Sequence, residues 1–105
     1  MNLIDKSTIL AFRVLIENKG ISNKEVAKTL GVSETGISKI THLRRCLSFS
    51  EVHMFCEKFG IPISEVSILT NKFLKNKKVL KQLQDLQNSK ATSRKLLANF
   101  LKDLC

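Results

Sequence analysis

Two pairs of histidine and cysteine have a spacing that could hold a metal ion. His42 and Cys46 are four residues apart, and His53 and Cys56 are three apart. Each pair would lie on one side of a helix, and two imidazoles with two thiolates can bind Zn²⁺. Free cysteine is also one of the most buried residue types, and His53 falls on the outer side of its expected helix. We therefore expect Cys56 to be a buried core residue, and we expect the protein to bind neither a metal ion nor a cofactor.

Other chemistry is poorly represented. No Ser/His/Asp or Cys/His/acid arrangement stands out, and there is no phosphate-binding glycine loop, so the sequence does not predict an enzyme.

Residues 34–42 instead offer hydrogen bonding to DNA bases. On a helical wheel, Ile37 and Ile40 lie on one side, with Gly36 beside them for close packing on the helix that contains Ala27. The opposite side is short and polar, as a helix that enters the major groove requires. The candidate base-contacting residues are Glu34, Thr35, Ser38, Lys39 and His42.

Several short helices must position this face, and the sequence predicts an all-α fold. It contains four Gly and one Pro, and its apolar residues recur at spacings of three and four. We expect helices over residues 8–19, 22–30, 33–43 and 48–59, and a fifth from residue 64. Glycines end three of them, and Ser22–Glu25 and Ser48–Glu51 are predicted capping boxes.

Composition narrows the class of partner. The chain has 105 residues, 43% of them hydrophobic, and a net charge of +9, which favours a polyanionic partner. Three cysteines are an odd number and argue against a secreted disulfide framework. The longest early apolar run, residues 9–12, stops at Arg13. We therefore expect a cytoplasmic protein without a signal peptide or membrane span.

The spacing of small, glycine and apolar positions has a recognisable pattern. It comprises Asn23-Lys-Glu-Val-Ala27, Leu30-Gly-Val-Ser33, Ile37-Ser-Lys-Ile40, Ser48, Val52, Phe55-Cys56, Phe59-Gly-Ile61 and Glu65-Val66. Over about residues 8–70 the chain thus resembles the Cro and lambda-repressor type (Xre) helix-turn-helix proteins. The resemblance implies a five-helix core that binds operator DNA, usually as a two-fold dimer. The helix over residues 33–43 would contact bases.

The same resemblance and the local charge imply contacts to the DNA backbone. The residues expected to make them are Asn23, Ser33, Arg44 and Arg45. The sequence departs from the family at Asn23 and in the turn after the recognition helix. The family usually has Gln where Asn23 stands, and it commonly has a Glu-x-Gly-x turn where Thr41-His-Leu43 follows the recognition helix.

Residues 71–105 differ in composition from residues 1–70. They hold nine Lys/Arg and two acids, a net charge of +7, and we expect a basic helical extension. Its amphipathic stripe consists of Leu96, Leu97, Phe100, Leu101 and Leu104. We expect this stripe to dimerise. The alternatives are that it folds back on the core or lies on an anionic membrane.

These observations predict a sequence-specific regulator of bacterial or phage origin, binding double-stranded DNA as a homodimer and acting as a repressor. Two alternatives stay open. One is an antitoxin that represses its own operon and masks a toxin with the extension. The other is an adaptor that keeps the helix-turn-helix shape but binds another regulator.

Overall fold

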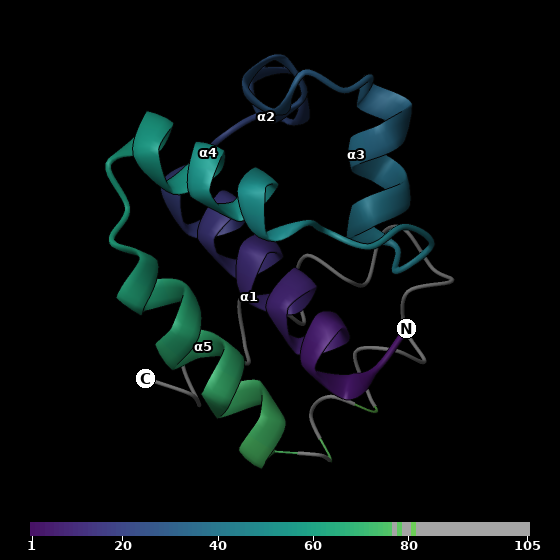
Figure 1. The fold of residues 1–105 in the computed structure, drawn as a ribbon, viewed down its shortest axis with the longest axis vertical. Coiled ribbons are helices and arrows are strands. Elements are labelled where there is room, and N and C mark those ends of the chain that lie inside the picture. The colour runs from purple at the N-terminus through teal and green to yellow at the C-terminus, as the bar shows by residue number, and fades with distance from the viewer. Residues whose placement is uncertain (77, 79–80, 82–105) are drawn as a thin grey trace.

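The computed structural model describes residues 1–76, 78 and 81, and five helices make up this part of the chain (Figure 1). They are α1 (Leu3–Lys19), α2 (Asn23–Leu30), α3 (Glu34–Thr41), α4 (Phe49–Phe59) and α5 (Ile63–Lys75). The predicted all-α, five-helix core is confirmed. None of these helices is long and apolar enough to cross a membrane.

Serine side chains begin three of the helices, as the sequence predicts. Ser22, Ser33 and Ser48 each accept a hydrogen bond from the backbone N–H three residues later. The reciprocal bond of a capping box is present at Ser48, where the Glu51 side chain accepts from the Ser48 N–H at 2.9 Å. At Ser22 only the serine half of the predicted capping box forms.

Two predicted helix starts are wrong. The first helix begins at Leu3 rather than residue 8, because the Asn2 side chain accepts from the Asp5 N–H at 2.8 Å and caps it earlier. The fifth begins at Ile63, directly after Pro62, whose φ of −62° leads into the helix. This helix continues to Lys75, so the change in composition near residue 72 falls inside a helix.

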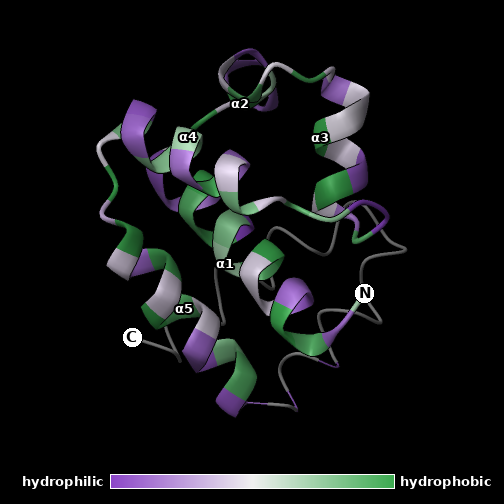
Figure 2. Cartoon of the chain, viewed as in Figure 1, coloured by the Kyte–Doolittle hydropathy of each residue, from purple (hydrophilic) through white to green (hydrophobic). Residues whose placement is uncertain are grey.

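The core forms around α1, which crosses the middle of the molecule in Figure 1 with α3 beyond one side of it and α5 beyond the other. Phe12 of α1 meets Phe55 of α4 edge to face, with ring centroids 4.7 Å apart. Ile9, Ile37 and Phe55 are fully buried in this core. Figure 2 shows the hydrophobic sides of the helices turned inward and the hydrophilic residues of α3 on its outer side.

Candidate nucleic-acid interface

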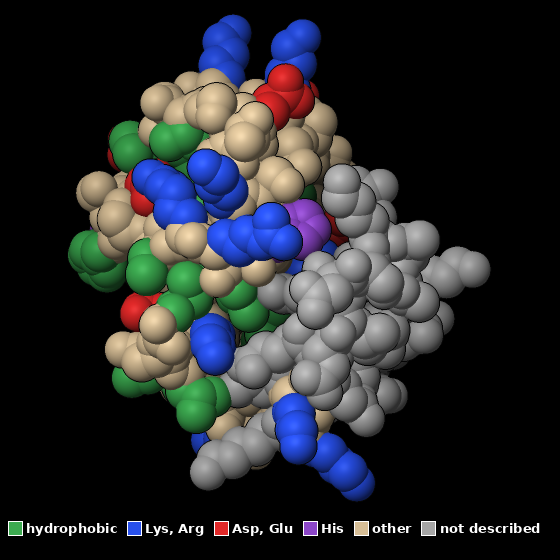
Figure 3. Space-filling view, turned by 90° about the vertical axis from the view of Figure 1, so that its right-hand side faces the viewer, with side chains coloured by type: hydrophobic (Ala, Val, Ile, Leu, Met, Phe, Trp, Pro, Cys, Tyr) green, Lys and Arg blue, Asp and Glu red, His purple; other side chains and the backbone are tan. Residues whose placement is uncertain are grey.

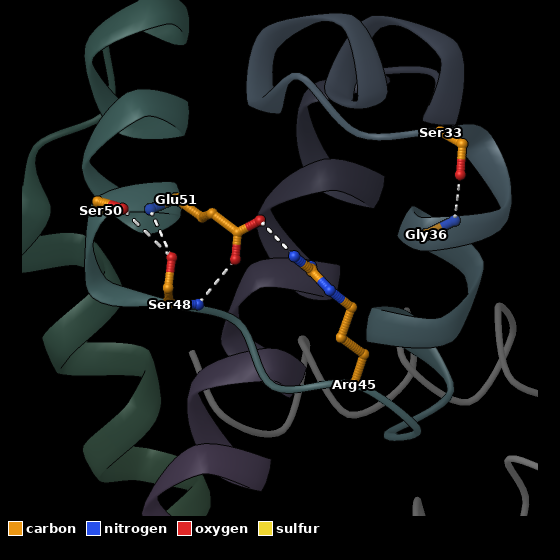
Figure 4. Close-up of polar contacts among 6 residues, drawn as sticks. All are labelled: Ser33, Gly36, Arg45, Ser48, Ser50 and Glu51. Atoms are coloured by element: carbon orange, nitrogen blue, oxygen red, sulfur yellow. Dashed lines mark hydrogen bonds and ion pairs between the residues drawn. The ribbon is translucent and has the colours of Figure 1, made fainter.

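The turn between α2 and α3 sets the orientation of the second helix. Gly31 has a φ of 68°, and its left-handed backbone ends α2. The Val32 N–H then donates to the Ala27 carbonyl at 3.1 Å. Ser33 accepts from the Gly36 N–H at 3.0 Å and starts α3 in a new direction (Figure 4). This bend carries one side of α3 out of the core.

The two sides of α3 differ sharply in burial. Ile37 and Ile40 have no exposed surface, whereas Glu34, Thr35 and Lys39 are exposed. Ser38 and His42 are half-exposed. The structure thus places four of the five predicted base-contacting residues on the polar side of α3 and the fifth, His42, at its C-cap. In the view of Figure 3, this face of the molecule carries several Lys and Arg side chains, some of them beside a histidine.

His42 is oriented by its own helix. Its Nδ1 lies 2.7 Å from the Ser38 carbonyl oxygen and 3.4 Å from the Ser38 hydroxyl. A carbonyl can only accept, so Nδ1 carries the hydrogen and Nε2 is the ring nitrogen left to meet a ligand.

Gly36 does not have the neighbours expected for it. A Cβ at this position would meet the Ser33 hydroxyl and the Val32 side chain at 3.5 Å, which is ordinary van der Waals contact. Ala27 is not among its nearest neighbours. The prediction that Gly36 is needed for close packing against the Ala27 helix is therefore wrong.

The end of α3 differs from the prediction. The helix stops at Thr41 rather than Leu43, because Leu43 adopts a left-handed conformation with a φ of 60°. The Leu43 N–H donates to the Ile40 carbonyl at 3.0 Å and the Arg44 N–H to the Lys39 carbonyl at 2.8 Å. This pair of bonds is a Schellman motif, which normally has glycine where Leu43 stands. The turn leaves Arg44 exposed beyond the polar side of α3.

Arg45 reaches toward α4 and is partly exposed. Its Nη2 lies 3.1 Å from Glu51 Oε2, and the two side chains are 40% and 9% exposed, respectively (Figure 4). Burial by itself would raise the pKa of Glu51, but hydrogen bonds from Ser48 and Arg45 and the Arg45 charge together leave this pKa lowered. The ion pair ties the loop after α3 to the first turn of α4.

A residue that the sequence analysis did not single out holds the other side of this loop. Arg13 of α1 donates from Nη1 to the Thr41 carbonyl at 3.1 Å. A cation at a helix C-terminus satisfies a free carbonyl and interacts favourably with the helix dipole. The available signal was a charged residue inside an otherwise buried run, because residues 9–12 and 14–16 are all buried.

A comparison with families of known proteins agrees with this geometry. The family model HTH_3, described as helix-turn-helix, matches residues 12–66. The chain belongs to this helix-turn-helix family. The resemblance to Cro and lambda-repressor type proteins is thereby confirmed. Searches among curated proteins and among solved structures each found no match.

Membership of the HTH_3 family indicates the role of α2 and α3. They are the two helices of a DNA-binding domain of the kind found in transcriptional regulators, a family that is typically not enzymatic. Asn23 is the exposed first residue of α2, and Ser33 is the exposed N-cap of α3. Both therefore lie at helix N-termini, on either side of the glycine turn.

The two histidines and the two described cysteines of this HTH_3 protein have different surroundings. Cys56 is 5% exposed in the core, and its burial, with the nearby Glu65, raises the pKa of its thiol. Cys46 is exposed, and the ring of His53 packs edge-on against Phe49 with centroids 4.5 Å apart. Within the described part of the chain, no three His, Cys, Asp or Glu side chains gather as a metal site.

Proposed function

We propose that the protein is a sequence-specific transcriptional repressor that binds a palindromic operator as a homodimer. One observation carries this proposal. On the polar side of α3, Glu34, Thr35 and Lys39 are exposed and Ser38 is half-exposed, while the apolar residues of the other side are fully buried in the domain core. A helix held in this way can enter the major groove without unfolding any other part of the domain.

The exposed side chains suit direct contact with base edges. The hydroxyls of Thr35 and Ser38 can donate or accept, Lys39 can donate to guanine O6 or N7, and Glu34 can accept from a cytosine amino group. His42 would use Nε2, since Nδ1 is occupied by the Ser38 carbonyl. These five residues would set sequence preference.

The flanking residues would hold the phosphate backbone. Arg44 is exposed beyond α3 and is available for a phosphate, and Asn23 and Ser33 would contribute from the two helix N-termini. Arg45 would contribute less to phosphate binding than Arg44, because its positive charge is already paired with the carboxylate of Glu51. These contacts would add affinity that falls as salt concentration rises.

Dimerisation would place two α3 helices in successive major grooves about 34 Å apart. We assign pairing to the extension over residues 71–105 and its stripe of Leu96, Leu97, Phe100, Leu101 and Leu104. The stripe lies outside the described residues. A dimer bound to the operator would exclude the polymerase from that site, which is the simplest form of repression.

Selection of binding sites from random duplex DNA tests the proposal. The wild type should enrich a palindrome, and Ser38→Ala with Lys39→Ala should lose sequence preference while keeping weak, salt-sensitive binding. The matched control is Lys58→Ala with Ser64→Ala, which removes the same groups from exposed positions of α4 and α5. Retained preference in the α3 double variant would contradict the proposal, as would its loss in the control.

The exposed carboxylate of Glu34 favours a second candidate, an adaptor that binds another protein through α3. A carboxylate at the start of this helix would be repelled by phosphate unless it meets a base amino group. Filter binding at low salt separates the two functions. The adaptor would leave duplex DNA unretained, whereas the repressor would retain it.

A further inference from the structure

One groove formed by the described residues is lined mainly by apolar side chains and includes no residue of α3. It has a volume of about 510 Å³ and is formed by the start of α1, the start of α4 and the side of α5 that carries Val66 and Thr70. Phe49 is 75% exposed at its edge, Ile4 is 60% exposed and Ile63 is 39% exposed. Such a concentration of exposed large apolar side chains normally marks a binding surface.

A second, larger groove is chemically different. Its volume is about 920 Å³, and it lies between α2 and α4. Four of its seven lining residues are charged: Glu25, Lys28, Glu57 and Lys58. The groove beside Phe49 has a single ionisable lining residue, Asp5. It is therefore the better match for an apolar helix that carries positive charge at its margins.

The sequence of the chain itself predicts such a helix near its C-terminus. The C-terminal arm, residues 93–105, carries the stripe of Leu and Phe described above, with three Lys/Arg and one Asp around it. We infer that the groove formed by α1, α4 and α5 receives the C-terminal arm of a second copy of this chain. The inference rests on the proposed function, because it specifies how the proposed dimer forms.

Chain length permits the exchange. Leu74 of α5 lines the groove itself, and nineteen residues lie between Asn76 and Leu96. Twenty steps along the chain span about 30 Å as a helix and about 65 Å when extended, and the longest extent of the described molecule is 33 Å. The arm can therefore leave its own subunit and reach the groove of a partner.

Electrostatics favours binding of an arm in the groove over pairing of the two arms with each other. Two arms of equal positive charge repel each other, whereas Asp5 at the groove attracts Lys or Arg at the edge of the stripe. Each subunit would give one arm and accept one, so the contact is made twice and closes a two-fold dimer. No residue of α3 lines the groove, so this contact does not use the side of α3 proposed to bind DNA.

Molar mass in solution tests the inference with full-length variants. The groove variant combines Ile4→Asp with Phe49→Asp, and the arm variant combines Leu97→Asp with Phe100→Asp. The wild type should have twice the chain mass of 11.9 kDa. Either variant should raise the dimer dissociation constant about 100-fold, as expected for losing a buried aromatic anchor and burying a charge.

Mixing the two variants is the decisive measurement. The arm variant has an intact groove and the groove variant has an intact arm, so an equal mixture should form a dimer held by one arm. Met54→Asp places the same charge on an exposed apolar residue outside this groove and should leave the mass unchanged. Thermal unfolding of each variant shows whether the exposed substitutions leave the fold intact.

Each other outcome overturns the inference. A groove variant that stays dimeric would show that arms pair with arms, and a dimeric arm variant would show that grooves pair directly. A monomeric wild type, or a mixture that stays monomeric, would exclude exchange. Binding of a single operator half-site by the monomeric variants is a separate readout. Loss of half-site binding would contradict the proposed DNA-binding function and would leave the exchange of arms untouched.

Discussion

The C-terminal ends of α1, α2 and α4 differ from that of α3. The first three end at Gly20, Gly31 and Gly60, with φ values of 64°, 68° and 64°, whereas α3 ends before Leu43 at 60°. Glycine adopts this conformation without strain, but for leucine it costs roughly 1–2 kcal/mol. Leu43 is tolerated because its side chain packs against the hydrophobic core.

The residues that follow these turns differ in the same way. Ile21, Val32 and Ile61 come after the glycines and pack in or against the core, while Arg44 comes after Leu43 and is exposed. After α1, α2 and α4 the chain therefore returns to the hydrophobic core, whereas after α3 it places a charged side chain in solvent. Side chains from outside α3 secure the fourth, with Arg13 before the turn and the Arg45–Glu51 pair after it.

The largest effect should come from breaking that ion pair. Glu51→Gln should lower the free energy of unfolding by about 2 kcal/mol, less than for a fully buried pair because Arg45 is partly exposed. The lowered native pKa means that the carboxylate stabilises the fold above the unfolded pKa of about 4.3 and stops doing so as pH falls through the native value.

Denaturant unfolding of both proteins between pH 7 and pH 3 measures this. The difference between wild type and Glu51→Gln should shrink as the pH falls, and a difference independent of pH would contradict the assigned cause. Glu57→Gln changes an exposed carboxylate on the same helix and serves as the control, with little expected effect.

Removing the cation before the turn should have the next largest effect. Arg13→Met keeps the apolar part of the side chain but loses the bond to the Thr41 carbonyl, and should cost about 1.5 kcal/mol. Amide hydrogen exchange should accelerate more in α3 than in α5. Equal acceleration in both helices would mean that Arg13 supports the whole core rather than the end of α3.

Exchanging glycine and alanine tests whether the two kinds of turn share one backbone requirement. Gly60→Ala should destabilise by about 1 kcal/mol through backbone strain, since an added Cβ there meets nothing within 4 Å. At position 43, Leu43→Gly should be more stable than Leu43→Ala by a similar amount. Both substitutions lose the leucine packing, so the difference isolates strain. Equal stability of this pair would refute a strained turn.

The smallest effect should come from the glycine inside α3. Gly36→Ala should stabilise the protein by about 0.7 kcal/mol, because alanine is the better helix former and its Cβ would make only ordinary contacts at 3.5 Å. Thermal unfolding measures it. If Gly36→Ala destabilised the protein, α3 would have no room for a side chain at this position.

Local signals made much of the fold predictable. The serine caps and glycine ends of α2 and α4 follow from hydrogen bonds between residues at most five apart, which a sequence displays directly. The start of α1 was missed because Asn2 caps it from a stretch with little apolar periodicity. The polar side of α3 was predictable because Ile37 and Ile40 define its opposite side.

The orientations of charged side chains were not predictable in this way. Arg44 and Arg45 are adjacent and chemically identical, yet one is exposed and the other pairs with Glu51. This difference depends on the turn at Leu43, whose positive φ could not be predicted because the position is not a glycine. The roles expected for these residues on DNA remain predictions.

The sequence by itself determined the five helices, most of their ends, and a helix with one apolar and one polar side, because each arises from contacts within a few residues. Tertiary structure alone decided which charges are committed to the fold. Arg13 reaches a carbonyl 28 residues away, and the groove beside Phe49 forms only where three helices meet. Such contacts depend on how distant segments pack, and no local pattern encodes that packing.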